Sequence, residues 1–208
     1  NVVITSRSQS KADDAALALS KLSKGKAIGV ACDVRSFEDQ IGAVSKTIEL
    51  FGTLDLLVAN AGVGHFASIE EMEIAKWNEV IDTNLTGVFY SIKAALDALK
   101  ESKGYIITIS SLAGANFFPT ASAYNASKFG LTGFTQSVML DLRHHGIKVS
   151  TIMPGSVATH FNGHQPNEKD AWKIQPEDIG QMVVDLLKMD PRTLPSKIEV
   201  RPSLPPSK

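Results

Sequence analysis

The order of apolar and polar residues along the chain predicts alternating strands and helices. Short, nearly unbroken apolar runs, typical of strands buried on both faces, alternate with longer segments in which apolar residues recur with helical period. This alternation is the pattern of βαβ units in a parallel sheet. The expected strands are Val2–Ser6, Ala27–Cys32, Leu54–Ala59, Tyr105–Ser110, Lys148–Met153 and Lys197–Val200.

The longer segments predict helices, several with recognisable ends. Ser36 followed by Asp39 matches an N-cap with an acidic first turn, and Gly52 and Gly146 suit C-terminal stops. The expected helices are Lys11–Lys24, Ser36–Phe51, Glu70–Lys100 with an interruption, Ser122–His145 and Pro176–Lys188. The predicted fold class is therefore α/β, a doubly wound parallel sheet between two helical layers in a three-layer αβα arrangement.

Small, polar or turn-forming residues follow five of the predicted strands. In an open parallel sheet, ligands bind outside the carboxyl ends of the strands, and these ends meet at one edge. The sequence therefore predicts a ligand site along that edge. The residues concerned are Arg7, Asp33, Asn60-Ala61-Gly62, Ser110-Ser111 and Pro154-Gly155.

Composition and charge narrow the possible functions. The chain has 208 residues, of which 43% are hydrophobic and 21% charged, which suits a single globular domain with a sizeable core. A formal net charge of -1 gives no basic excess for binding nucleic acid. No run approaches the roughly 20 apolar residues of a membrane span. The single cysteine, Cys32, excludes an intrachain disulfide and suits a reducing compartment, so a cytoplasmic location is expected.

Tyr124 and Lys128 form a candidate acid/base pair. They are four residues apart on one predicted helix and therefore share a face. Free tyrosine titrates near ~10, and a neighbouring ammonium lowers the pKa toward the range useful for proton transfer at neutral pH. The alternative is an exposed helix face without chemistry. His160 and His164 lack a third ligand at suitable spacing, so no metal site is expected and a polar loop is the preferred interpretation.

Six motifs occur in order over most of the chain, and together they resemble those of the short-chain dehydrogenase/reductase family. They are Cys32-Asp33-Val34, Asn60-Ala61-Gly62, Asn84-Leu85-Thr86-Gly87, Ile109-Ser110-Ser111, Tyr124-Asn125-Ala126-Ser127-Lys128 and Pro154-Gly155-Ser156-Val157-Ala158-Thr159. Ser111 also lies 13 residues before Tyr124, the interval that the family uses. The resemblance is to 3-oxoacyl-ACP reductases and broad carbonyl reductases, and it implies a Rossmann-like form of the predicted fold.

The resemblance implies four catalytic residues. Tyr124 would donate a proton, and Lys128 would lower the pKa of that tyrosine and hold the nicotinamide ribose. Ser111 would hydrogen-bond the substrate oxygen, and Asn84 would anchor a water in a relay behind the lysine. A purely structural polar residue in a helix is the alternative for Asn84.

The resemblance also implies the residues that bind a nicotinamide cofactor. Asp33 would meet the adenine amino group, or cap the next helix, or both. Ser6 and Arg7 end the first strand where an acidic residue usually selects NAD, and a guanidinium there suits a phosphate, so NADP(H) is favoured over NAD(H). The alternative for Arg7 is a side chain that only faces solvent. The other expected contacts are Val34, Asn60, Ala61, Gly62, Tyr124, Lys128, Pro154, Gly155, Val157 and Thr159.

One unit of the family pattern is missing upstream of Asn1, namely a strand followed by a glycine-rich turn. By analogy, that strand would lie between Val2–Ser6 and Leu54–Ala59. We expect an empty slot there, two strand spacings of ~4.8 Å wide, with unpaired backbone on both sides. Residues 1–208 are accordingly expected to form a single, N-terminally incomplete Rossmann-like domain.

The expected function is NADP-dependent interconversion of an alcohol and a carbonyl, either a 3-oxoacyl-type group or a general ketone or aldehyde. The alternatives are an NAD-dependent alcohol or polyol dehydrogenase and an inert cofactor-binding protein. The partner is a small molecule. The candidates for apolar pocket walls are His65, Phe66, Phe117 and Phe118, with core or loop packing as the alternative. Pairing of the helices expected in Glu70–Lys100 and Ser122–His145 would form a homodimer or homotetramer.

Overall fold

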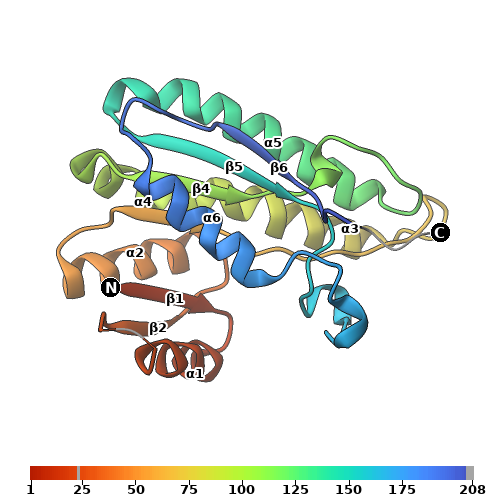
Figure 1. The fold of residues 1–208 in the computed structure, drawn as a ribbon, viewed down its shortest axis with the longest axis horizontal. Helices are drawn as coiled ribbons and strands as arrows, with labels where there is room; N and C mark the ends of the chain where they lie inside the picture. The colour runs from red at the N-terminus through yellow and green to blue at the C-terminus, as the bar shows by residue number, and fades with distance from the viewer. Residues whose placement is uncertain (23, 205–208) are drawn as a thin grey trace.

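The computed structural model describes residues 1–22 and 24–204, in which strands and helices alternate along the chain (Figure 1). The six parallel strands of this described part lie close to the predicted positions. They are β1 Val2–Ser6, β2 Ala27–Ala31, β3 Leu56–Ala59, β4 Tyr105–Ile109, β5 Lys148–Pro154 and β6 Lys197–Val200.

Most helices lie close to their predicted positions, although the helix expected over Ser122–His145 ends at Leu142 and continues as a 3-10 turn to His145. Ser36 caps its helix by accepting a hydrogen bond from the Asp39 backbone N–H, and Gly52 and Gly146 adopt the left-handed conformation at helix ends. The long helices are α1 Gln9–Ser20, α2 Phe37–Phe51, α3 Ile74–Ile81, α4 Gly87–Ser102, α5 Ser122–Leu142 and α6 Pro176–Lys188.

Backbone hydrogen bonds divide the strands into two parallel sheets. One sheet has the order β1-β2 and the other the order β3-β4-β5-β6. β1 and β3 do not pair, and a cavity of about 660 Å³ lies between them, lined by both strands and by residues of α2 and α4. The empty slot expected between Val2–Ser6 and Leu54–Ala59 is thus confirmed.

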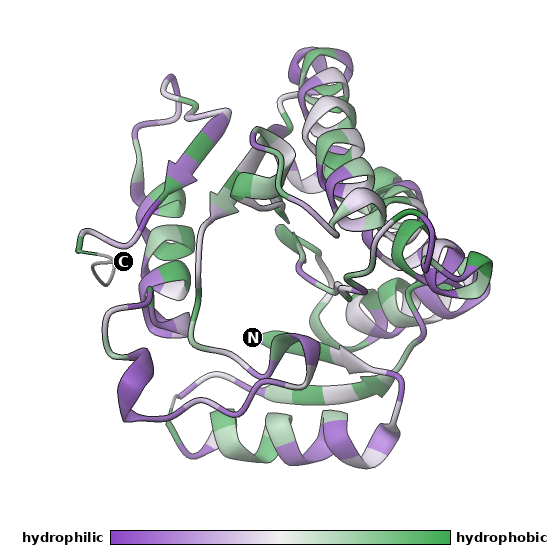
Figure 2. Ribbon diagram, turned by 90° about the vertical axis from the view of Figure 1, so that its right-hand side faces the viewer, coloured by the Kyte–Doolittle hydropathy of each residue, from purple (hydrophilic) through white to green (hydrophobic). Residues whose placement is uncertain are grey.

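The core lies on both faces of β4, which runs through the larger sheet. Ile106 packs with Val149 of β5 and with apolar residues of α4 and α5, such as Leu99 and Leu131. Its neighbour Ile107 belongs to a second cluster that includes Leu186 of α6. Successive side chains of a strand point to opposite faces, so these clusters mark two helical layers, as predicted. In Figure 2 the helices carry both apolar and polar colouring, as expected for elements with one face on the core.

The segment expected as Glu70–Lys100 is two helices joined by a π-helical turn, Asp82–Thr86. The first helix begins only at Ile74, four residues later than predicted. Gly87 follows the turn where a Cβ would lie 3.0 Å from Val34 Cγ2, so the absence of a side chain there lets α4 approach the segment after β2 without displacing Val34. The expected interruption is therefore a defined turn that holds Asn84 at its centre.

The first helix differs from its prediction at both ends. It was expected over Lys11–Lys24, but it spans Gln9–Ser20, and residue 23 lies outside the described residues. Gln9 begins it because its amide donates to Gly29 O at 3.0 Å and accepts from Ala31 N at 2.8 Å, which satisfies the outer edge of β2. None of the described helices is both long and apolar enough to cross a membrane.

Candidate active site

A cleft of about 1110 Å³ opens at the carboxyl ends of β4 and β5 and extends along α5. It brings together residues from the segments after β3, β4 and β5, as the strand-end pattern predicts. The predicted site residues that line it are Asn60, Gly62, Ser111, Tyr124, Lys128, Pro154, Gly155, Val157 and Thr159.

The remaining predicted residues lie outside this cleft. Val34 and Ala61 line the cavity between the two sheets, which Asn60 shares with the cleft. Ser6 and Arg7 end β1 and follow it. Asp33 follows β2, and the positive charge of Arg7 contributes to the lowering of its pKa. Ser6, Arg7 and Asp33 therefore mark a second region, at the carboxyl ends of the smaller sheet formed by β1 and β2.

Tyr124 stands near the start of α5, half-buried between aromatic rings. The centroids of Phe66 and Phe161 lie 5.4 Å and 5.6 Å from its own. Burial raises the tyrosine pKa above its usual value, and a hydrogen bond with Ser111 opposes this rise. The phenol is therefore protonated at neutral pH, which is the form that can donate a proton to a carbonyl oxygen.

The raised pKa of Tyr124 corrects one expectation from the sequence. Lys128 was expected to lower this pKa, but it is raised in the structure. The physical reason is desolvation of the phenol by burial, which outweighs the opposing effect of Ser111. Lys128 Nζ lies 5.7 Å from the centroid of the tyrosine ring.

Lys128 is almost completely buried, one turn along the same helix. Its side chain reaches the end of β4, where Nζ donates to Ile109 O at 2.9 Å. Burial lowers its pKa from the usual 10.5 to about 8. The amine is therefore mainly protonated at neutral pH, and two of its three donors are left over after the bond to Ile109 O.

The two serines after β4 have different surroundings. The Ser110 hydroxyl is buried against Lys128 O and Thr132 Oγ1, so it braces α5 against the sheet. Ser111 lines the cleft, accepts from Ala113 N at 3.1 Å and donates to Pro154 O at a long 3.4 Å. Ser111 is thus the serine whose hydroxyl can reorient toward a ligand.

Asn84 is fully buried and bonds to two other segments. Its Nδ2 donates to Val63 O at 2.9 Å and Ser127 Oγ at 3.0 Å, and its Oδ1 accepts from Val63 N at 2.8 Å. These bonds link the π turn to the segment after β3 and to α5. A Cβ on Gly62 would lie 3.4 Å from Asn84 Oδ1 and 3.8 Å from Lys128 Nζ, so the three residues share one crowded corner.

Asp33 is held by Arg35. The carboxylate accepts from the Arg35 side chain and backbone, with Oδ2 at 2.5 Å from Nη2, and these bonds lower its pKa to about 2. Arg35 was not among the residues expected from the sequence. Together with the exposed Arg7, it makes the surroundings of Asp33 cationic.

Two backbone hydrogen bonds join the start and the end of the segment between β5 and α6. Ala158 N donates to Ile174 O, and Ile174 N donates to Ser156 O. Inside this loop Asn162 and Gly163 have positive φ, and their turn places Phe161 beside Tyr124. Phe161 was missed from the sequence, since aromatic residues in loops carry no periodic signal. Positive φ at a non-glycine residue can be read only from coordinates.

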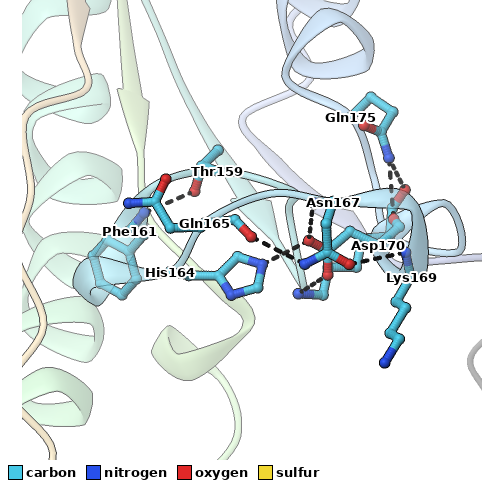
Figure 3. A network of polar contacts seen from close by, with 9 residues as sticks. Thr159, Phe161, His164, Gln165, Asn167, Lys169, Asp170 and Gln175 are labelled. Carbon is cyan, nitrogen blue, oxygen red and sulfur yellow. Dashed lines mark hydrogen bonds and ion pairs between the residues drawn. The ribbon is translucent and has the colours of Figure 1, made fainter.

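A buried carboxylate holds this loop together (Figure 3). Asp170 accepts from Lys173 Nζ at 2.6 Å and from Asn167 N at 3.1 Å, and its Oδ2 lies 2.6 Å from His164 Nε2. The bonds from Lys173 and His164 lower the Asp170 pKa well below its usual range. His164 thus has an acidic partner six residues on. No group of three or more potential metal ligands occurs in the described part of the chain.

Comparison with known proteins identifies the family. A family model described as short chain dehydrogenase matches residues 1–170. The chain belongs to the short-chain dehydrogenase family. This confirms the resemblance inferred from the six motifs, and the family's members are NAD(P)-dependent oxidoreductases.

Two curated relatives show the range within this family. The chain is 42% identical over 133 residues to trans-4-hydroxycyclohexanecarboxylate dehydrogenase of Sinomonas cyclohexanicum, covering 64% of this chain and 51% of that enzyme. It is 36% identical over 159 residues to a 3-oxoacyl-[acyl-carrier-protein] reductase of Synechocystis, covering 76% and 64%. The matched regions thus span about half to two thirds of these relatives.

A solved short-chain dehydrogenase fold confirms the architecture over almost the whole chain. The alcohol dehydrogenase of Thermococcus sibiricus, determined with 5-hydroxy-NADP, superimposes with a TM-score of 0.91 at 26% identity. The match covers 99% of this chain and 88% of that one. The Rossmann-like α/β fold inferred from the sequence is therefore confirmed.

Replacing Asp170 with Asn should lower the melting temperature in a pH-dependent way. The depressed pKa means that the charged carboxylate stabilises the fold above the unfolded pKa of about 4, and this stabilisation is lost as the pH falls toward the folded pKa. The difference in melting temperature between the protein and D170N is thus expected to be large at pH 6 and to shrink below pH 4.

Asp97→Asn is the matched control, because the Asp97 carboxylate is 97% exposed and lies 4.0 Å from its lysine partner. Thermal unfolding followed by circular dichroism measures both variants. An equal effect of D97N and D170N, or a difference for D170N that does not change with pH, would contradict the role of Asp170.

Proposed function

We propose that this protein is an NADP-dependent oxidoreductase that interconverts a carbonyl and an alcohol. The observation that supports it most directly is the meeting of Ser111, Tyr124 and Lys128 in one cleft, with burial keeping the tyrosine protonated. The substrate would be a 3-oxoacyl-type group or a general ketone or aldehyde. The catalytic roles of these residues, and that of Asn84, belong to this proposal.

The chain's own residues account for the proton transfer. Ser111 and Tyr124 would both donate to the substrate oxygen, which polarises the carbonyl and fixes its orientation. Tyr124 would then release its proton to that oxygen during reduction and accept it during oxidation. The charge on Lys128, close to the phenol ring, would favour the transient tyrosinate. A bound nicotinamide supplies or accepts the hydride.

The residues of the cleft fit a nicotinamide nucleotide. The two remaining donors of Lys128 suit ribose hydroxyls. The small residues Gly62 and Gly155 leave the backbone open to close approach, and Asn60, Pro154, Val157 and Thr159 complete the wall. Asn84 would act by positioning Val63 and α5, and the water relay that the family resemblance implies remains part of the proposal.

The preference for NADP(H) over NAD(H) is supported by the charges at the ends of β1 and β2. Arg7 is exposed there, beside Ser6. Arg35 forms an ion pair with Asp33 and so neutralises its negative charge. A guanidinium can bind a phosphate through two parallel hydrogen bonds. The Thermococcus sibiricus alcohol dehydrogenase is complexed with an NADP derivative, which agrees with this preference. Asp33, Val34 and Ala61 would line the adenosine end.

Two further parts of the proposal concern assembly and location. Phe89 on α4 is 46% exposed and Leu140 on α5 is 51% exposed, and these helices would pair with their symmetry mates in a homodimer or homotetramer. Sedimentation velocity is expected to show an assembly larger than the 22.3 kDa monomer, and a monomer alone would contradict this part. Cys32, a free and buried thiol, agrees with a reducing cytoplasm.

Tyr124→Phe should abolish turnover without loss of folding. The substitution removes only the hydroxyl, so the rate of ketone reduction with NADPH should fall about 10²- to 10⁴-fold. Affinity for NADPH, measured by fluorescence titration, should change little. Tyr90→Phe is the control, since Tyr90 lies on α4 between Phe37 and Phe89, away from the cleft. Unchanged turnover in Y124F would disprove the assignment, and NADPH binding without turnover in the native chain would favour an inert cofactor-binding protein.

Arg7→Ala should weaken NADPH more than NADH. Loss of a charge-assisted contact to phosphate corresponds to about a 10- to 100-fold rise in the dissociation constant for NADPH, while that for NADH should stay nearly constant. Isothermal titration with each nucleotide measures this difference. Arg192→Ala serves as the control, because Arg192 is an exposed arginine paired with Asp190. Equal affinities of R7A and the native chain for NADPH would instead support the NAD-dependent alternative.

A further inference from the structure

Three phenylalanine side chains gather beside Tyr124 in the cleft and remain partly exposed. Phe66 and Phe161 contact the tyrosine ring, and the Phe118 centroid lies 6.4 Å from that of Phe66. They are 39%, 38% and 45% exposed, and all three line the cleft. They come from three segments distant in sequence, so their meeting is a property of the fold. A contiguous exposed apolar surface at a reactive group suggests that a ligand covers it.

Gly64 allows two of these rings to converge. A Cβ at this position would lie 2.6 Å from Phe161 Cζ and 2.9 Å from Phe66 Cε2. Any larger residue would therefore push the tip of one or both rings away. Phe161 also depends on the turn at Asn162 and Gly163, inside the loop that Asp170 holds together. The position of this aromatic wall is thus set by two separate features of the chain.

The aromatic wall formed by Phe66, Phe118 and Phe161 presents apolar ring surfaces to a ligand, without hydrogen-bonding groups on these side chains. The hydroxyl groups of a sugar or polyol lying against the wall would lose their bound water without gaining a hydrogen-bond partner. The sugar would therefore bind more weakly than an apolar ligand of the same size. Two nearby polar side chains of the cleft, His164 and Lys173, are already bound to Asp170. An alkyl or ring body would instead bury the exposed faces of the phenylalanine rings.

We propose that the substrate body next to the reacting carbon is apolar, so that the protein acts on alicyclic and aliphatic ketones and secondary alcohols rather than on sugars or polyols. This inference rests on the proposed oxidoreductase function and adds its substrate class. Phe66, Phe118 and Phe161 are then specificity-determining residues, and Gly64 is a positioning residue that acts through two of them.

The test compares kcat/KM for the reduction of cyclohexanone and acetone, and for the oxidation of cyclohexanol and sorbitol, in the full chain and in three variants. Cyclohexanone is expected to be preferred over acetone, and its alcohol over sorbitol. Phe161→Ala and Gly64→Ala should each lower kcat/KM for cyclohexanone on the order of 10-fold and change that for acetone little. Phe117→Ala is the matched control, because Phe117 is 82% exposed and stacks on Phe129 outside the cleft lining.

A second measurement separates this inference from the proposed function. Binding of cyclohexanone, followed by saturation-transfer NMR, needs no turnover. Loss of that signal in F161A and G64A but not in F117A would support the apolar site even if no carbonyl were reduced. If carbonyl reduction is measured but sorbitol is oxidised in preference to cyclohexanol, or if F117A and F161A lose equal activity, the apolar site would be overturned and the oxidoreductase function would stand.

Discussion

The burial of Lys128 is the constraint on which the rest of the site depends. A charged amine with 4% of its surface exposed must find polar partners, and it finds one in the last carbonyl of β4. The backbone carbonyl of Lys128 also accepts a hydrogen bond from the Ser110 hydroxyl, so two bonds join α5 to the end of β4. Tyr124, one turn earlier, is thereby held at a fixed height above the sheet edge.

The π turn at Asp82–Thr86 completes this arrangement from the other side. It turns the buried amide of Asn84 toward Val63 and Ser127, and so connects β3, α4 and α5 at the level of the lysine. π turns are rare and occur often at functional sites, since they add one residue without ending the helix. Here the extra residue is what brings a side-chain amide into the corner behind Gly62.

Much of this could be predicted from the sequence because it follows from periodicity. Unbroken apolar runs such as Tyr105–Ile109 are buried on both faces, so the strands were predicted to within two residues at each end. Features that depend on tertiary contacts were not accessible in this way. The late start of α3 at Ile74 has no side-chain capping bond to signal it. The burial that raises the Tyr124 pKa depends on rings from segments distant in sequence, and the Asp170 cluster forms within a loop that has no periodic pattern.

The π turn also fixes the rotation of α4 about its own axis. Gly87 N–H bonds to Asp82 O five residues earlier, so the turn holds one residue more than an α-helical turn. Each residue of an α-helix turns the chain by about 100°, so if these same residues folded as a regular α-helix, everything after the turn would be rotated by that angle relative to α3. Val88, Ile92, Ala95 and Leu99, which now form one buried stripe, would then leave the core. The π turn that holds the Asn84 amide in place therefore also determines which face of the sixteen-residue helix α4 points toward the core.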